Sequence, residues 1–225
     1  MAHTKRIAAG YGKKPKFITT VMPGPHKKNE SLPLLYVVRD ILNLAKNARE
    51  AKYIIHSGKI LVDKKPRKEH KYGVGFMDVV EIPLISKFYR VLPSKKGLYL
   101  KEISEEEANY KPLRIMNKTV VKKGKIQLNL HDGSNILLSQ DEAKEYSTKD
   151  TVIVKLPGRK IEKLIKFKEG NYAMIAKGEH SGYVGKIKSY IPGTKTRKSL
   201  TTVDNVQTLT DYIFVIGEEK PEISV

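Results

Sequence analysis

The chain has 225 residues and no Cys, and its 43 Lys and Arg against 24 Asp and Glu give a formal net charge of +19. A chain without Cys cannot carry a disulfide framework or a thiolate zinc site. No apolar run reaches about eighteen residues and no signal-peptide core opens the chain, so we expect a cytoplasmic protein without a membrane partner. The positive charge makes a polyanion such as nucleic acid the first partner to consider.

Residues 1–30 contain seven Lys or Arg but only one acid, Glu30, and three prolines interrupt any long helix. Such a segment buries too little apolar surface to fold alone, so we predict a basic arm that becomes ordered on RNA. An ordinary disordered tail is the alternative interpretation. The predicted RNA-binding residues of the arm are Lys5, Arg6, Lys13, Lys14, Lys16, His26, Lys27 and Lys28.

A helix is predicted to start at Ser31, which would cap it, with Pro33 in the first turn. Apolar residues then recur at helical spacing from Leu34 to Ala45. We expect this stripe to be core and assign no chemistry to it. It should face the next helix, over residues 48–55.

Residues 47–82 are predicted to form a basic helix, a turn and two strands. Asn47 is the expected N-cap and Gly58 the expected end of the helix. Strands are expected at 59–62 and 77–82, with a turn at 63–66. The predicted phosphate-binding cations are Lys46, Arg49, Lys52, His56, Lys59, Lys64, Lys65, Arg67, Lys68 and Lys71. A solvated basic face without RNA contact is the alternative.

From residue 84 to 166 the pattern is that of short strands. Ser104 and Glu107 form a capping box for one helical turn, and Asp132-Gly133 between alternating runs predicts a hairpin. Further phosphate contacts are expected from basic residues of this block, with simple surface charge as the alternative. These residues are Arg90, Arg114, Lys122, Lys123 and Lys125.

Residues 167–217 are predicted to form a small barrel, with glycines at its tight corners. Gly178, Gly182 and Gly185 follow an alternating strand, and a closing strand runs from 212 to 217. A flexible basic loop is expected at 188–200, and the acidic start of the tail, at 218–221, is expected to be exposed. The loop residues predicted to bind RNA are Lys188, Lys195, Arg197 and Lys198.

Three resemblances follow from these residues. Ala48-Arg49-Glu50-Ala51, Ile55-x-x-Gly58, Ile60-Leu61-Val62-Asp63 and Met77-Asp78-Val79-Val80 resemble the RNA-binding domain named after bacterial ribosomal protein S4. Residues 167–187 are similar to a KOW motif. The order of Gly24-Pro25-His26-Lys27, Ser31-Leu32-Pro33-Leu34 and Gly75-x-x-Asp78-Val79 resembles the archaeal and eukaryotic small-subunit ribosomal protein S4e family. The chain stops soon after its closing strand, which favours an archaeal-type member.

The resemblance implies an α+β multi-domain chain. We expect a basic arm at 1–30, a small α/β RNA-binding domain of the S4 type at 31–83 and a central all-β domain at 84–166. A C-terminal SH3-like KOW β-barrel at 167–217 and a tail at 218–225 would follow. The implied function is that of a structural constituent of the small ribosomal subunit, bound to rRNA and neighbouring ribosomal proteins. No cofactor, metal or small-molecule substrate is implied.

Two other functions remain open from the sequence. An RNA-modifying enzyme could carry the same recognition domain, but it would need a catalytic Asp, and Asp132 and Asp204 both have turn-like contexts. No P-loop, dinucleotide-binding motif or serine elbow occurs, and the six His show no zinc-site spacing, so we do not expect an enzyme. A transcription or translation factor could use the barrel to bind a protein partner.

Overall fold

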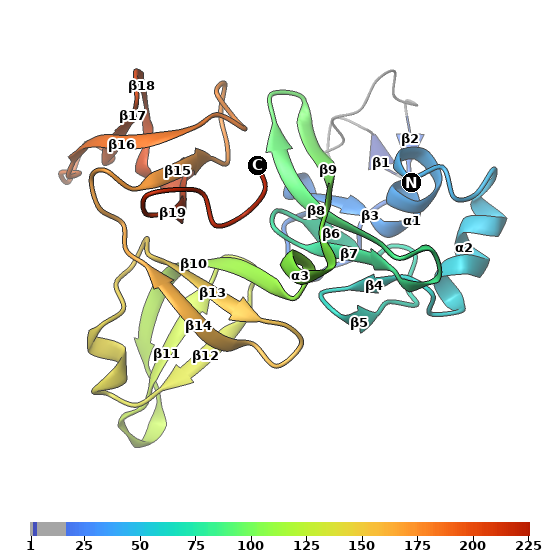
Figure 1. Ribbon diagram of the computed structural model, residues 1–225, viewed down its shortest axis with the longest axis horizontal. Coiled ribbons are helices and arrows are strands. Elements are labelled where there is room, and N and C mark those ends of the chain that lie inside the picture. The colour runs from blue at the N-terminus through green and yellow to red at the C-terminus, as the bar shows by residue number, and fades with distance from the viewer. Residues whose placement is uncertain (1, 4–16) are drawn as a thin grey trace. The chain divides into compact units, whose positions relative to one another are not determined.

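The computed structural model describes residues 2–3 and 17–225 and divides the chain into two compact units (Figure 1). Unit 1 comprises residues 1–111 and 156–158, and unit 2 comprises residues 112–155 and 159–225. The structure is mostly β, with several sheets and few helices. The short 3₁₀ turns are η2 (Lys28–Glu30), η4 (Pro83–Ile85), η5 (Lys122–Gly124), η6 (Glu142–Lys144) and η7 (Thr210–Tyr212).

Unit 1 is built on a five-stranded antiparallel sheet of order β5-β4-β7-β8-β9. Its strands are β4 (Leu61–Val62), β5 (Lys65–Pro66), β7 (Val79–Ile82), β8 (Lys87–Ser94) and β9 (Gly97–Ile103). Two small pairs accompany it, β1 (Ala2–His3) with β2 (Phe17–Ile18) and β3 (Ser31–Pro33) with β6 (Gly73–Gly75). The helices are α1 (Leu34–Tyr36), a π-helical turn (Val37–Ile41), α2 (Ala48–His56) and α3 (Glu105–Ala108).

The first helix is shorter than predicted and starts later. Ser31 is not its cap, because Ser31 pairs with Gly75 in the β3–β6 ladder and its hydroxyl donates to the Lys27 carbonyl. The helix begins after Pro33 instead and turns into the π-helical segment within three residues. Its apolar residues pack with Ala51 and Ile55 of α2 in one core cluster, which confirms the predicted packing of the two helices.

The predicted boundary between residues 83 and 84 falls inside a sheet. Strand β7 pairs with β8 along four residues, from Val79 with Arg90 to Ile82 with Lys87. In the structure, the first compact unit continues to Lys111 and also includes residues 156–158. The end of the predicted arm also belongs to the folded unit, because Ile18 and Val21 are buried in its core.

A buried lysine lies at the centre of unit 1. Lys111 is 1% exposed, and its ammonium group donates to Asp63 Oδ2 and Asp78 Oδ1, both at 2.6 Å. Asp63 Oδ1 also accepts from the Val79 amide at 3.1 Å, and Asp78 Oδ2 from the Gly75 amide at 2.8 Å. Burial alone would raise the pKa of Asp78, but Lys111, His26 and the Gly75 amide together outweigh it, so the pKa lies below its ordinary value.

The same lysine fixes the hairpin turn between β4 and β5. The two turn residues, Asp63 and Lys64, both have positive φ, at 53° and 62°. Two such residues in a two-residue loop give the type I′ geometry, whose twist matches that of paired strands. Asp63 thus has two functions, because its backbone makes the turn and its carboxylate binds Lys111 inside the unit.

Two arginines predicted to contact phosphates are buried. Arg90 is 0% exposed, and its guanidinium donates to the carbonyls of Glu107 and Tyr110 at 3.0 and 2.9 Å. Burial lowers its pKa to about 10. Arg114, in unit 2, is 7% exposed and donates to the Asp211 carbonyl at 2.7 Å. The prediction was wrong for both, because each guanidinium is buried and donates to backbone carbonyls within its own unit.

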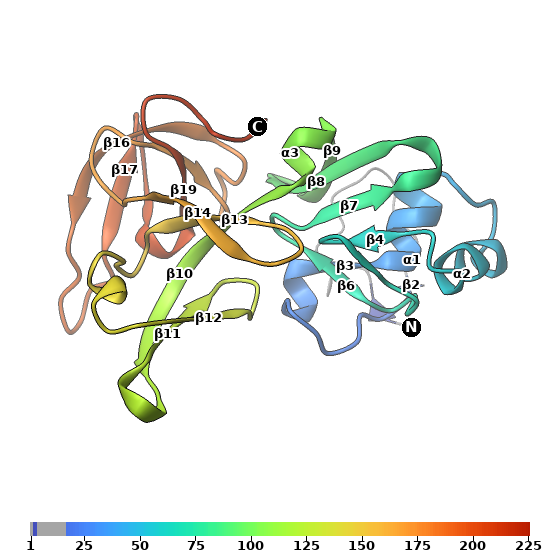
Figure 2. The ribbon, with the colours of Figure 1, turned by 60° about the horizontal axis from the view of Figure 1, so that its bottom comes forward.

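Unit 2 contains two five-stranded sheets (Figure 2). The first has the order β12-β11-β10-β13-β14, with β10 (Tyr110–Val120), β11 (Ile126–Leu130), β12 (Asn135–Leu138), β13 (Thr151–Lys155) and β14 (Lys160–Ile165). The second is a half-barrel of order β18-β17-β16-β15-β19, with β15 (Tyr172–Ile175), β16 (Val184–Ile191), β17 (Leu200–Val203), β18 (Val206–Leu209) and β19 (Ile213–Gly217).

Two local predictions, one in each unit, are confirmed. Asp132 is a turn residue of the β11–β12 hairpin, accepting from the Ser134 amide at 3.0 Å. Ser104 caps α3 by accepting from the Glu107 amide. Glu218, Glu219 and Lys220 of the tail are exposed as predicted, whereas the residues after Pro221 pack back, with Ile223 at 7% exposed and Glu222 accepting from Lys163 Nζ at 2.6 Å.

The buried lysine gives a prediction about stability. Lys111→Met should lower the free energy of unfolding by about 3–5 kcal/mol, because it leaves two buried carboxylates without their cation. Urea unfolding followed by circular dichroism measures this loss.

The matched control is Lys87→Met in the same unit. Lys87 forms an exposed pair with Glu102, at 3.6 Å, and exposed pairs contribute about 0–1 kcal/mol. Equal effects of the two substitutions would contradict a structural function for Lys111.

Candidate nucleic-acid interface

One face of α2 presents three basic side chains and an aromatic ring. Arg49, Lys52, Tyr53 and His56 are all exposed and have the spacing i, i+3, i+4 and i+7. Residues at this spacing lie on one side of a helix. The opposite side carries Ala51 and Ile55, which are fully buried. We call Arg49, Lys52, Tyr53 and His56 the basic helix face.

The acid of this helix is used in its cap. The Asn47 side chain accepts from the Glu50 amide at 2.9 Å, and its own amide group donates back to Glu50 Oε1 at 2.8 Å. Glu50 Oε2 accepts from the Lys46 amide, also at 2.8 Å. This arrangement confirms Asn47 as N-cap. It also directs the carboxylate towards the start of the helix, where negative charge is favourable.

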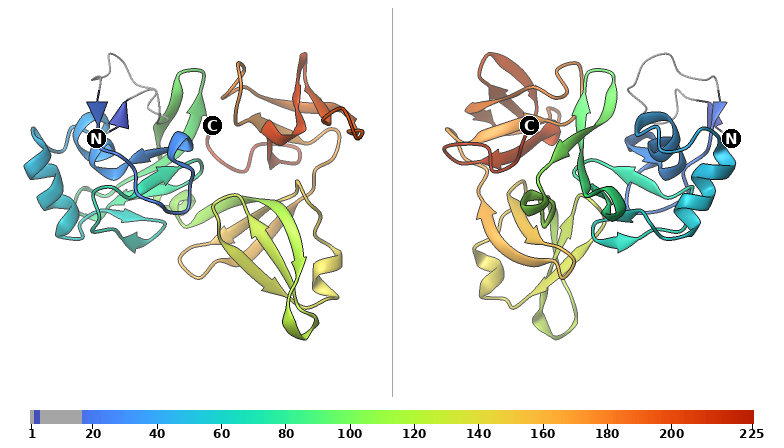
Figure 3. Two further views of the ribbon diagram at one scale, coloured as in Figure 1. Left: turned by 180° about the vertical axis from the view of Figure 1, so that it is seen from behind. Right: turned by 45° about the vertical axis from the view of Figure 1, so that its right-hand side comes forward.

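The loop at residues 63–71 lies against the end of α2 (Figure 3). The Arg67 amide donates to the Ile60 carbonyl at 3.1 Å, and the rings of His56 and His70 meet edge to face with centroids 6.1 Å apart. Gly58, with φ of 72°, turns the chain between helix and loop. A Cβ at Gly58 would lie 3.5 Å from Cε of Lys68, so the loop passes close to the turn.

The pKa of His70 reflects the cations of both the helix and the loop. Burial lowers its pKa, Glu69 opposes that effect, and Lys52, Lys71 and His56 lower the pKa further. Helix and loop cations therefore act on the same imidazole. Positive groups held this close repel one another, and a bound polyanion would relieve that repulsion.

Most of the predicted RNA-binding residues in the described part of unit 1 are on its surface. The exposed ones are Lys27, Lys28, Lys46, Arg49, Lys52, His56, Lys59, Lys65, Lys68 and Lys71. Two others are half-buried. Lys64 forms an ion pair with Glu81 at 3.2 Å, and the guanidinium of Arg67 lies 4.3 Å from the centre of the Tyr72 ring. Both have intramolecular partners that an RNA phosphate would have to displace or share.

His26 is placed inside the unit, in contrast to the prediction. Its side chain is 5% exposed, and its Nε2 lies 2.9 Å from Asp78 Oδ2. The ring fills the space above Gly75, where a Cβ would collide with it. His26 thus extends the Lys111–Asp78 network. The sequence alone could not separate this function from RNA contact, because the partner lies 52 residues away.

The predicted basic loop of unit 2 is exposed but shorter than predicted, because Lys188 lies within β16 and the loop spans 192–199. Lys188, Lys195, Arg197 and Lys198 all lie on the surface, and Lys188 Nζ donates to the Asn205 side chain at 3.1 Å. The tip of the loop is closed by a bond from the Thr194 amide to the Arg197 carbonyl, at 2.8 Å. The arm cations Lys5, Arg6, Lys13, Lys14 and Lys16 lie outside the described residues.

Sequence reasoning missed Tyr53. This residue is 72% exposed on the basic helix face, although aromatic side chains are usually at least half-buried. Its spacing of four residues from Arg49 and one from Lys52 was a signal available in the sequence. An exposed ring among cations can stack on an unpaired base while its neighbours bind phosphates.

The other chemistry considered from the sequence finds no site in the described residues. Across residues 2–3 and 17–225, no cluster of three or more His, Asp or Glu could hold a metal ion. Asp204 accepts from the Tyr183 hydroxyl at 3.2 Å and from the Lys186 amide, which makes it a turn residue like Asp132. Within the same part of the chain, no helix is long and apolar enough to cross a bilayer.

Comparisons with known proteins agree on one family. A model described as ribosomal family S4e matches residues 85–161. The chain is 44% identical to small ribosomal subunit protein eS4 of Methanosphaera stadtmanae, over 99% of this chain and 95% of that protein. It is 43% identical to eS4 of Archaeoglobus fulgidus, over 99% and 97%. A crystal structure of 30S ribosomal protein S4e from Thermoplasma acidophilum superposes with a TM-score of 0.74 and 34% identity, covering 85% of this chain and 97% of that one.

The position of His26 generates a test that uses two histidines. His26→Ala should lower the free energy of unfolding by about 1–3 kcal/mol, because it leaves a buried carboxylate with one partner fewer. His56→Ala, on the exposed helix face, should change it by no more than about 0.5 kcal/mol. Chemical unfolding of both variants measures the contrast. If both were neutral, the imidazole of His26 would not be part of the buried network.

Proposed function

The chain belongs to the ribosomal S4e family, and we propose on this premise that its basic surfaces bind folded rRNA and stabilise the local architecture of the small subunit. As an S4e protein, it is a structural constituent of the small ribosomal subunit and not an enzyme. The observation that supports the mode of binding is the joining of the basic helix face to the cationic loop at 63–71. Both elements are anchored by buried contacts, so their charges stay in place before RNA arrives.

Charge and shape, and not base sequence, would govern this interaction. An A-form helix has a deep, narrow major groove that side chains cannot read, so proteins contact its phosphates and 2′-hydroxyls. Lysines on a rigid helix and loop suit phosphates, because an ammonium group needs no fixed orientation to its partner. Tyr53 adds the capacity to stack on a base where the RNA is unpaired.

The finer organisation is also part of this proposal. Residues from α2 to β7 would act as an RNA-binding module of the S4 type, and the half-barrel with its loop at 192–199 as a KOW-type module. The arm cations Lys5, Arg6, Lys13, Lys14 and Lys16, with Lys27 and Lys28, would contribute further phosphate contacts. Neighbouring ribosomal proteins would be the other partners, on cytoplasmic ribosomes.

A triple substitution tests the proposed interface. Changing Arg49, Lys52 and Lys65 together to Ala should weaken binding to small-subunit rRNA, because three phosphates lose their counter-charge. The log–log dependence of affinity on salt should become shallower by about 2–3 units, at about 0.7–0.9 per phosphate contact. Filter binding at several salt concentrations measures both effects, and a circular dichroism melt shows whether the variant is folded.

The control removes the same charge from the same unit. Lys87, Lys95 and Lys96 are exposed on and around the β8–β9 hairpin. Their combined change to Ala should leave the salt dependence close to that of the wild type. If the two triple variants lose affinity equally, net charge and not the α2 surface determines binding.

A further inference from the structure

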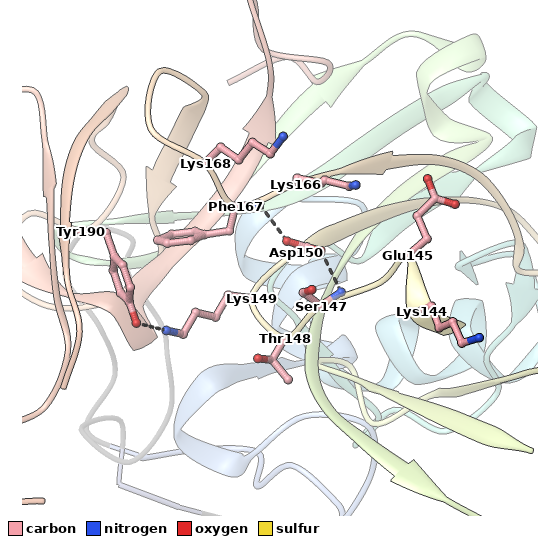
Figure 4. Close-up of a pocket in the computed structure, with 10 residues that line it drawn as sticks. All are labelled: Lys144, Glu145, Ser147, Thr148, Lys149, Asp150, Lys166, Phe167, Lys168 and Tyr190. Carbon is pink, nitrogen blue, oxygen red and sulfur yellow. Dashed lines mark hydrogen bonds between the residues drawn. The ribbon is translucent and has the colours of Figure 1, made fainter. Parts of the chain in front are cut away.

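A hollow of about 450 Å³ opens on the surface of unit 2 (Figure 4). It is lined by residues 144–145 and 147–150, by residues 166–168 after β14, and by Tyr190 of β16. Its volume falls within the roughly 300–1,000 Å³ of small-molecule sites. None of these residues belongs to the interface proposed above.

One end of the hollow is aromatic. The rings of Phe167 and Tyr190 meet edge to face, with centroids 5.5 Å apart and an interplanar angle of 85°. Both rings are half-buried, and Phe167 also packs against the apolar core of the unit. Figure 4 shows them together at one end of the lining, with Lys144 and Glu145 at the other.

A lysine is held between the aromatic rings and the rest of the lining. Lys149 Nζ donates to the Tyr190 hydroxyl at 2.7 Å and lies 4.5 Å from the centre of the Tyr190 ring and 5.8 Å from that of Phe167. Lys149 has φ of 78°, a left-handed conformation that costs energy for a residue with a Cβ. Its amide is fixed by the Ile115 carbonyl at 2.9 Å. The backbone therefore holds this ammonium group at the aromatic end.

A buried carboxylate fixes the walls. Asp150 is 4% exposed, and it accepts from the Phe167 amide at 2.8 Å and from the Ser147 amide at 2.9 Å. The two segments that form the walls are thus tied to one side chain. The hollow is preformed, which reduces the entropy lost when a ligand binds.

The charge of the lining favours an anion. Lys144, Lys149, Lys166 and Lys168 face two acids, Glu145 and Asp150. Asp150 is already occupied by the two backbone amides, so it offers little to a cation. The lining has two aromatic rings at one end and ammonium groups both beside the rings and along the walls, which matches a flat ring that carries an anionic substituent.

We propose that this hollow binds a single unpaired nucleotide, with its base against Phe167 and Tyr190 and its phosphate near Lys149, Lys166 and Lys168. The inference rests on the proposed binding of rRNA, because it takes the nucleotide to be one that protrudes from a folded RNA. Stacking on aromatic rings tolerates any base, and lysines fix the phosphate without reading sequence. The site would therefore recognise a bulge by its shape.

Photocrosslinking of the full chain tests the proposal. The probe is an RNA hairpin with a single bulged 5-iodouridine, and the reference is the same hairpin with that nucleotide base-paired. Irradiation should link the bulged base to Tyr190 or Phe167, identified by mass spectrometry, and the paired base to neither. The bulged hairpin should also bind about tenfold more tightly than the paired one, from the stacking of one base.

Substitutions at and away from the hollow test whether the crosslink arises there. Tyr190→Leu should abolish the crosslink and the preference for the bulge, while Tyr183→Leu, an exposed tyrosine of the same unit, should retain both. Lys168→Gln, at an exposed position that does not threaten the fold, should weaken binding of the bulged hairpin more than of the paired one.

The outcomes separate this proposal from the previous one. Equal binding of the two hairpins, or crosslinks that map elsewhere, would overturn the nucleotide site while leaving RNA binding intact. Failure to retain either hairpin would count against the proposed function itself. Titration with AMP is the remaining experiment. If AMP competes for the hollow but the bulged hairpin does not crosslink there, the claim that the nucleotide belongs to RNA is wrong.

Discussion

The ammonium group of Lys111, enclosed between two carboxylates, is the interaction on which unit 1 depends. Its partners come from the β4–β5 turn and from the residue before β7, and His26 joins through Asp78. Four segments distant in the sequence therefore meet at one charge. Removing one partner of a buried ion pair is strongly destabilising, because it leaves a charge uncompensated in the interior. The basic loop at 63–71 begins at Asp63, whose carboxylate binds Lys111. The buried network therefore fixes the start of this exposed loop.

The same residue types have two opposite functions in this chain. Lys111, Arg90 and Arg114 are buried and satisfy carboxylates or backbone carbonyls. The cations of α2 and of the loop at 63–71 are mostly exposed, and Lys52, Lys71 and His56 act on a shared imidazole. Buried cations thus hold the fold together, whereas exposed ones repel each other and leave charge for a polyanion. The net charge of +19 does not distinguish these two functions, because it counts buried and exposed cations alike.

Local features could be predicted from the sequence because their causes lie within a few residues. Asn47 and Ser104 cap helices through a bond to an amide three residues on, and Asp132 makes a turn with Ser134. The functions of His26, Arg90 and Lys111 could not be predicted, because each depends on a partner at least 17 residues away. The predicted boundary after residue 83 separated β7 from β8, which the 3₁₀ turn at Pro83–Ile85 joins within one sheet. Tyr53 was missed although its helical spacing was visible.

The most direct test is the affinity of the full chain for small-subunit rRNA as salt is raised. If about ten exposed cations each neutralise a phosphate, the logarithm of the binding constant should fall against that of salt with a slope of about −7 to −9. A slope near zero, with affinity unchanged across the range, would contradict a surface that binds RNA by its charge.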